Sequence, residues 1–113
     1  MTKAIKTKLL ANGASKVEMD HKPVVKFFDP TGSATWWISE MMADEDTLFG
    51  LCDLGFGCPE LGNVSLKELA TTKVRFNLNI ERDLHFVGNK PLSEYLFDLE
   101  SKNKAYASQS MEA

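Results

Sequence analysis

The chain has 113 residues, of which 43% are hydrophobic, and this composition is typical of one globular domain with an adequate apolar core. Its formal net charge of -3 argues against a general electrostatic grip on nucleic acid, which needs a basic surface. No apolar run approaches the roughly 20 residues of a membrane span, and the apolar patch at residues 9–11 is too short for a signal peptide. We therefore expect a cytoplasmic protein without a membrane partner, whose cysteines Cys52 and Cys58 are reduced.

The first predicted element is a helix over residues 2–11. Asn12 and Gly13 follow it and are typical of a helix C-terminus. Ile5 and Leu9 lie on one helical face at i, i+4 spacing, and a helix this short is marginal alone. The helix is therefore expected to dock on the rest of the domain.

Three strands are predicted next. Pro23 precedes a strand over residues 24–28, and residues 29–33 form a turn, because proline presets φ and glycine supplies a left-handed step. A second strand over residues 34–42 completes a hairpin. After an acidic loop, a third strand over residues 47–53 gives a three-stranded antiparallel meander.

Residues 54–63 contain three glycines and a proline, so we expect an ordered but irregular loop. The glycines are expected to adopt positive φ or to permit close backbone approach. Ser65 and Glu68 then have the spacing of a capping box, in which the serine caps a helix and the glutamate reaches back. A short helix to about residue 72 follows.

Apolar and polar residues alternate through residues 75–86, and this pattern predicts one bulged strand or two strands. Arg82 interrupts the apolar side of the alternation. An unpaired charge there would be very costly, so Arg82 is expected to be largely buried and paired with Glu60 or Asp53.

The last predicted helix begins at Pro91 and has a buried stripe made of Leu92, Tyr95, Leu96 and Leu99. From Lys104 the chain is polar, so we expect one domain over residues 1–103 and a frayed tail over residues 104–113. The predicted fold class is α+β. An antiparallel sheet of four or five strands carries N- and C-terminal helices packed on it, with a short capped helix between strands.

Seven short segments carry a resemblance to a known family: residues 20–26, 34–36, 49–55, 59–62, 64–66, 81–86 and 90–92. They resemble an uncharacterised domain family of unknown function that occurs in bacterial conjugative plasmids, integrative elements and phages. The match covers most of the chain. It transfers no catalytic residue, and what it implies is a small cytosolic protein of a mobile genetic element.

The sequence gives little support for either a cysteine metal site or a cysteine nucleophile. Cys52 and Cys58 are six residues apart, unlike the tight pairs of zinc sites, so a metal site with His21 and His85 is disfavoured against simple packing. Cys58, His85 and Asp83 are the residue types of a cysteine nucleophile with its base, but an exposed strand face explains the last two equally well.

An acidic metal site is the alternative enzymatic hypothesis. Asp53, Glu60, Glu81 and Asp83 are the residue types of a magnesium-dependent hydrolase or nuclease, with His85 nearby in sequence. Two structural explanations compete with it. Asp53 can cap the glycine-rich loop by accepting from backbone N–H groups, and Glu60 can pair with Arg82.

Trp36 and Trp37 are consecutive, so they face opposite sides of their strand. One is expected in the core, and the other needs a cover, either a helix or a partner protein. The predicted binding patch comprises Trp36, Trp37, Asp53, Glu60 and His85, where the glycine-rich loop meets the second and third strands.

The leading functional hypothesis is therefore a non-catalytic interaction protein of a mobile element that acts on a host or defence protein, without cofactor or metal. The alternative is the metal-assisted hydrolase or nuclease that uses the acidic cluster. A sequence-tolerant binder of single-stranded nucleic acid is a third class, which the negative charge disfavours.

Overall fold

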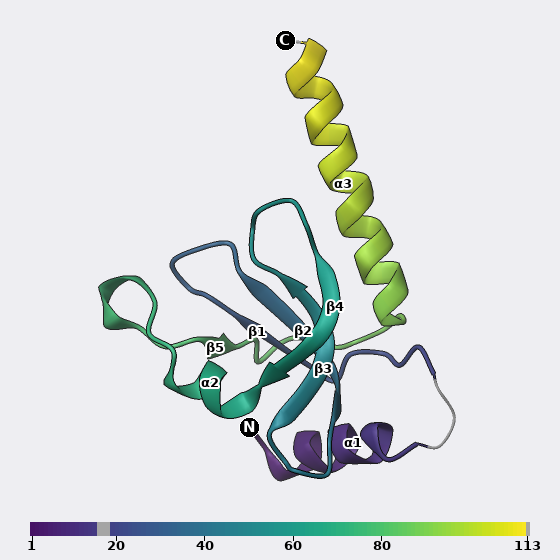
Figure 1. Ribbon diagram of the computed structural model, residues 1–113, viewed down its shortest axis with the longest axis vertical. Coiled ribbons are helices and arrows are strands. Elements are labelled where there is room, and N and C mark those ends of the chain that lie inside the picture. The colour runs from purple at the N-terminus through teal and green to yellow at the C-terminus, as the bar shows by residue number, and fades with distance from the viewer. Residues whose placement is uncertain (16–18, 113) are drawn as a thin grey trace.

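The computed structural model describes residues 1–15 and 19–112, with side chains described as far as Lys104. Its elements are, in chain order, α1 (Lys3–Gly13), β1 (Val25–Phe28), β2 (Thr35–Met41), β3 (Thr47–Asp53), β4 (Glu60–Ser65), α2 (Leu66–Thr71), the short 3-10 helix η1 (Arg75–Asn77), β5 (Glu81–Arg82) and α3 (Leu92–Glu112). The strands form one antiparallel sheet in the order β4-β3-β2-β1-β5 (Figure 1). The predicted α+β class, with a helix near each terminus and a short capped helix between strands, is confirmed.

One face of the sheet, which we call the core face, carries the hydrophobic core. Residues that pair directly across antiparallel strands point to the same side, so Val25 and Ile38 share this face. Leu48 also belongs to it. Leu9 of α1 and Leu69 of α2 close over them, and all five side chains are buried. The first helix therefore docks on the sheet, as its length required.

The opposite face, which we call the α3 face, is covered by the start of the last helix. Leu51 of β3 and Leu92 of α3 are both buried there. The carboxylate of Asp20 accepts hydrogen bonds from the backbone N–H and the hydroxyl of Ser93, and the N–H of Leu92 donates to the carbonyl of His21 at 3.2 Å. The segment before β1 thus caps the N-terminus of α3, and the rest of α3 extends past the sheet (Figure 1).

The short helix α2 begins at the predicted serine cap, but the acidic residue that completes the cap differs from the predicted one. The Ser65 hydroxyl accepts from the N–H of Glu68 at 3.2 Å, which confirms the serine cap. The acid that completes the cap is Asp46 rather than Glu68. Its carboxylate accepts from the Ser65 hydroxyl at 2.7 Å and from the N–H of Lys67 at 2.8 Å. Asp46, which lies in the turn just before β3, therefore links that turn to the start of α2.

The long strand predicted over residues 75–86 is wrong. Only Glu81 and Arg82 are paired in the sheet, as β5. Phe76 and Asn77 have φ near 59° and 58°, in the left-handed region, so the chain turns back instead of extending. The alternating residues therefore lie mostly in an exposed loop. Of the apolar half of the pattern, Ile80 packs against the core, whereas Phe76, Leu78 and Leu84 are exposed.

The irregular loop predicted over residues 54–63 is too long, because its second half forms β4. Gly62 lies inside that strand and pairs with Gly50 of β3. The glycine prediction is confirmed at Gly55 and Gly57, whose φ values are 86° and 80°. The glycines of the sequence indicate the turn, but they do not indicate that strand pairing with β3 resumes at Glu60.

The predicted pairing of Arg82 with Glu60 or Asp53 is wrong. Arg82 is half-buried and lies opposite Phe27 in the edge strand β5. Asp53 and Glu60 lie on β3 and β4, on the other side of β2. Ion pairs in the described part of the chain involve only lysines as cations, so Arg82 has no carboxylate partner there. At a sheet edge, a long side chain reaches water and needs none.

Within residues 1–15 and 19–112, no helix is both long and apolar enough to cross a membrane. The helix α3 continues to Glu112, beyond the domain boundary predicted near residue 103. Fraying of this end in solution stays a prediction.

The close approach of β2 and β3 predicts which glycine of the Gly50–Gly62 pair cannot be replaced. A Cβ on Gly50 would lie 2.0 Å from the carbonyl oxygen of Trp37, whereas a Cβ on Gly62 would meet nothing within 4 Å. We expect Gly50→Ala to lower the free energy of unfolding by about 1–3 kcal/mol or more, because backbone cannot move aside as a side chain can. Gly62→Ala, directly opposite on the ladder, is the control, and chemical denaturation should find it within about 0.5 kcal/mol of the parent. Equal losses for the two variants would contradict the close approach.

Candidate functional site

The loop between β3 and β4 is held at both of its ends. The Asp53 carboxylate accepts from the N–H of Gly55 at 2.9 Å, which is the capping role that the sequence offered for this acid. Further along, the side-chain amide of Asn103 on α3 donates to the carbonyl of Gly57 at 3.3 Å. The two glycines held by these bonds, Gly55 and Gly57, both have positive φ. The loop therefore has a defined shape that presents the side chain between its glycines, Phe56.

This loop and the adjoining strands form an exposed hollow on the core-face side of the sheet. Trp36, Cys52 and Glu60 pair in register across β2, β3 and β4, so their side chains share that face. The hollow has a volume of about 230 Å³. Its lining residues are Cys52, Leu54, Phe56, Cys58 and Glu60. We call Trp36, Cys52, Leu54, Phe56 and Glu60 the rim patch.

Phe56 dominates the rim patch because 84% of its surface is exposed. Leu54 beside it is also exposed, whereas Trp36 is half-buried and packs against the hydrophobic core. Trp36 is therefore the anchored end of the patch and Phe56 its free end. The sequence pointed to the tryptophans here and missed the phenylalanine, although its position between two glycines is a readable signal of an aromatic side chain on a turn.

Cys52 has a perturbed thiol. Partial burial raises the pKa of Cys52, and the neighbouring carboxylate of Glu60 raises it further because a thiolate and a carboxylate repel. Both cysteines are free, and Cys58 is exposed. The protonated thiol of Cys52 is a packing group and the opposite of an activated nucleophile.

The remaining predicted site residues do not gather at the rim patch. Asp53 is on the opposite face from Glu60, because successive strand residues alternate. The N–H of Asp83 donates to Lys26 of β1, so Asp83 is three strand spacings from β3, about 14 Å at about 4.8 Å each. His85 follows Asp83 and donates its N–H to that carboxylate at 2.9 Å.

This separation removes the geometry for the acidic metal site and for the cysteine nucleophile. Asp53, Glu60 and Asp83 do not converge, and Cys52 and Cys58, which line the hollow beside β3 and β4, are far across the sheet from His85. Asp83 is instead paired with Lys26 at 3.8 Å. Across the described residues, no three His, Cys, Asp or Glu side chains are grouped so that they could hold a metal ion.

Trp37, on the α3 face, has the cover that the sequence left open. Its ring lies 6.1 Å from that of Tyr95 of α3, centroid to centroid, and the ring of Phe86 lies 6.2 Å from that of Tyr95. The ammonium of Lys26 is 5.6 Å from the centre of the Trp37 ring. The half-buried Trp37 is therefore a docking platform for the last helix.

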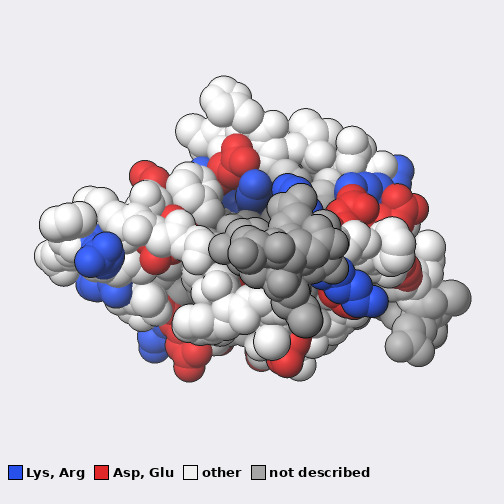
Figure 2. Space-filling model, turned by 90° about the horizontal axis from the view of Figure 1, so that it is seen from above, with Lys and Arg blue, Asp and Glu red and all other residues white. Residues whose placement is uncertain are grey.

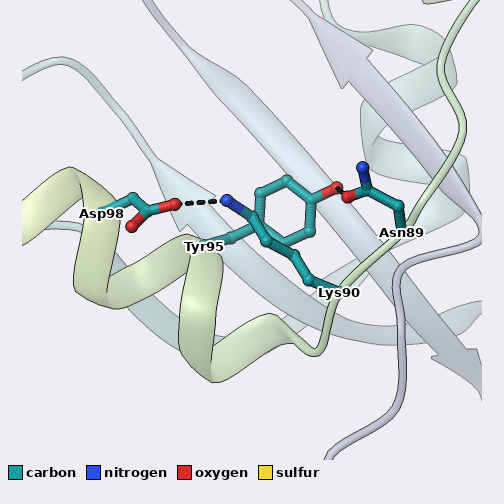
Figure 3. A network of polar contacts seen from close by, with 4 residues as sticks. All are labelled: Asn89, Lys90, Tyr95 and Asp98. Atoms are coloured by element: carbon teal, nitrogen blue, oxygen red, sulfur yellow. Dashed lines mark hydrogen bonds and ion pairs between the residues drawn. The ribbon is translucent and has the colours of Figure 1, made fainter.

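Tyr95 is in turn held by the segment before α3 (Figure 3). The ammonium of Lys90 lies 4.6 Å from the centre of the Tyr95 ring. It also forms an ion pair with Asp98, which is about one helical turn after Tyr95 on α3. The hydroxyl of Tyr95 donates to the side-chain oxygen of Asn89 at 3.3 Å. The bond to Asp98 raises the pKa of Lys90, so this cation stays charged over the ring at neutral pH.

The surface charge is mixed on the face of the molecule that Figure 2 shows. Figure 2 views the end of the molecule toward which α3 extends, and acidic and basic side chains are interspersed over its described residues. The described residues of that face form no continuous basic stripe for a phosphate backbone.

The ladder between Cys52 and Glu60 makes a test of the rim patch possible. In Glu60→Gln, the pKa of Cys52 should fall because the repelling carboxylate is gone, and iodoacetamide should then alkylate Cys52 several-fold faster at pH 8, measured by mass spectrometry. Cys58 in the same molecule is the internal control and should keep its rate. An unchanged rate at Cys52 would show that Glu60 does not lie against its sulfur.

Comparison with known proteins places the chain in a family but adds no activity. The model of the family described as "Protein of unknown function (DUF2958)" matches residues 1–105. No curated protein and no solved structure matches the chain. The family match covers all of the elements described above except the far end of α3. The chain therefore belongs to the DUF2958 family.

Proposed function

We propose that this protein is a non-catalytic interaction protein that binds a partner protein through the rim patch. The single observation that carries the proposal is Phe56, an aromatic side chain exposed at 84% on a loop of defined shape. Aromatic side chains are the commonest energetic anchors of protein interfaces, because they bury much area with few rotatable bonds. A loop held in place binds at a lower entropic cost than one that must be ordered.

The size and composition of the hollow support a protein partner over a small substrate. Its volume of about 230 Å³ is below the range of about 300–1,000 Å³ that is common for small-ligand pockets. Apolar groups surround one acid, Glu60. An apolar anchor beside a single charge is suited to recognising a complementary side chain on another protein surface.

The cellular setting of the proposal comes from the resemblance described above. We propose that the protein acts in the cytosol of a bacterium that carries a mobile element, on a host or element-encoded protein. Its binding would then modulate that partner, for example a defence protein. The separated acids Asp53, Glu60 and Asp83 give no support to the hydrolase or nuclease alternative.

Two equally exposed phenylalanines provide a matched test. Phe56 and Phe76 are exposed at 84% and 85% on different loops, so replacing either with alanine should leave the melting temperature nearly unchanged. In pull-downs from bacterial lysate, we expect Phe56→Ala to reduce partner recovery at least about tenfold, as loss of an interface anchor does. Phe76→Ala should recover the partner like the parent. Normal capture by Phe56→Ala, or loss with Phe76→Ala alone, would refute the assignment.

A further inference from the structure

A second and larger hollow lies on the α3 face, separate from the rim patch. It has a volume of about 500 Å³ and is bounded by residues 19–21, the first residues of α3 and the sheet. The sheet side consists of the apolar residues Met42, Phe49 and Leu61 and one acid, Glu40. The volume is within the range of about 300–1,000 Å³ that is typical of small-ligand sites. We call it the Glu40 groove, after the acid in its wall.

A β-bulge places this acid in the groove. The pairing of β2 with β3 shifts register between Ile38 and Glu40, so that Glu40 lies opposite Phe49. The side-chain amide of Asn12 on α1 donates to the carbonyl of Ser39 at 2.9 Å and holds the bulge from the other side of the sheet. Bulges re-aim a side chain and are frequent beside functional sites.

Glu40 has no partner for its charge in the described structure. It is half-buried, and its carboxylate makes no hydrogen bond or ion pair with any described residue. The other acid in the groove, Asp20, is occupied by Ser93. Among the described residues that line the groove there is no lysine or arginine. A carboxylate that loses part of its hydration among apolar groups gains most from a cation that replaces the lost water.

The rest of the lining favours the same ligand chemistry. His21 is half-buried in the wall, and an unprotonated ring nitrogen of an imidazole can accept a hydrogen bond. Phe49 and Met42 offer an aromatic face and a thioether against which an apolar or aromatic body can pack. We propose that the Glu40 groove binds a small organic amine, with its ammonium group on the Glu40 carboxylate and its apolar body against Phe49 and Met42. This proposal is independent of the rim patch.

The probe is 2-phenylethylamine, and its neutral counterpart is 2-phenylethanol. Titration at pH 8, followed by ¹H–¹⁵N NMR on the full chain, should shift the amides of Phe49 and Leu61 with the amine only. Glu40→Gln keeps the shape of the side chain and should weaken binding at least about tenfold, the usual loss when a charged hydrogen-bond partner is removed. Glu94→Gln is the matched control, because this exposed acid at the start of α3 is outside the groove.

Each outcome decides the proposal. Binding of the amine that Glu40→Gln weakens, while Glu94→Gln and Phe56→Ala leave it unchanged, supports the site. Equal binding of 2-phenylethanol, equal loss in both glutamine variants or no saturable shift would overturn it. Binding at least tenfold tighter by a peptide with one internal arginine would also overturn it, since the groove would then recognise a protein side chain. Melting curves of all variants establish that any loss is not unfolding.

Discussion

The packing of Tyr95 on Trp37 is the contact on which the rest of the α3 face depends. It fixes the first turns of α3 against β2, with a lysine ammonium over each of the two rings. The position of α3 then determines both hollows. Its first residues form one wall of the Glu40 groove, and Asn103, three turns further along, holds the loop that carries Phe56. A short five-stranded sheet thus uses one aromatic contact to place two separate surfaces.

The two surfaces differ in chemistry because they lie on opposite faces. On the core face, the rim patch continues the hydrophobic core outward and ends in an exposed phenylalanine. On the α3 face, the groove is an apolar hollow with an unused carboxylate. An exposed aromatic suits a protein surface, and a half-buried acid in an apolar groove suits a small cation. The membership in the DUF2958 family is compatible with either role, since that family carries no stated activity.

Local signals predicted the first half of the fold well. The turn before β2 and the bounds of β3 follow from short-range rules on turn chemistry. The predicted helix stop at Asn12 and Gly13 is wrong, because both residues belong to α1 and its C-cap is Ala14. The pattern over residues 75–86 failed because alternation cannot report two consecutive left-handed residues, Phe76 and Asn77. The terminal helices and the serine cap were predictable because each depends on residues near in sequence.

The candidate sites were less predictable because they depend on distant contacts. Glu60 belongs with Cys52 and Trp36 only through the register of three strands, and a loop prediction over residues 54–63 hid that register. Glu40 carried no signal in the sequence, because its place in the groove follows from a bulge held by α1. The cover of Trp37 was one of two open alternatives, and only the fold identifies Tyr95 as that cover.

A double-mutant cycle between Trp37 and Tyr95 tests the central claim most directly. The free energy of unfolding would be measured by chemical denaturation for the parent, Trp37→Leu, Tyr95→Leu and the double variant. If the two rings hold α3 on the sheet, the effects are not additive, and the coupling energy is about 0.5–1.5 kcal/mol in favour of the native pair. Additive effects, with a coupling energy near zero, would contradict the account.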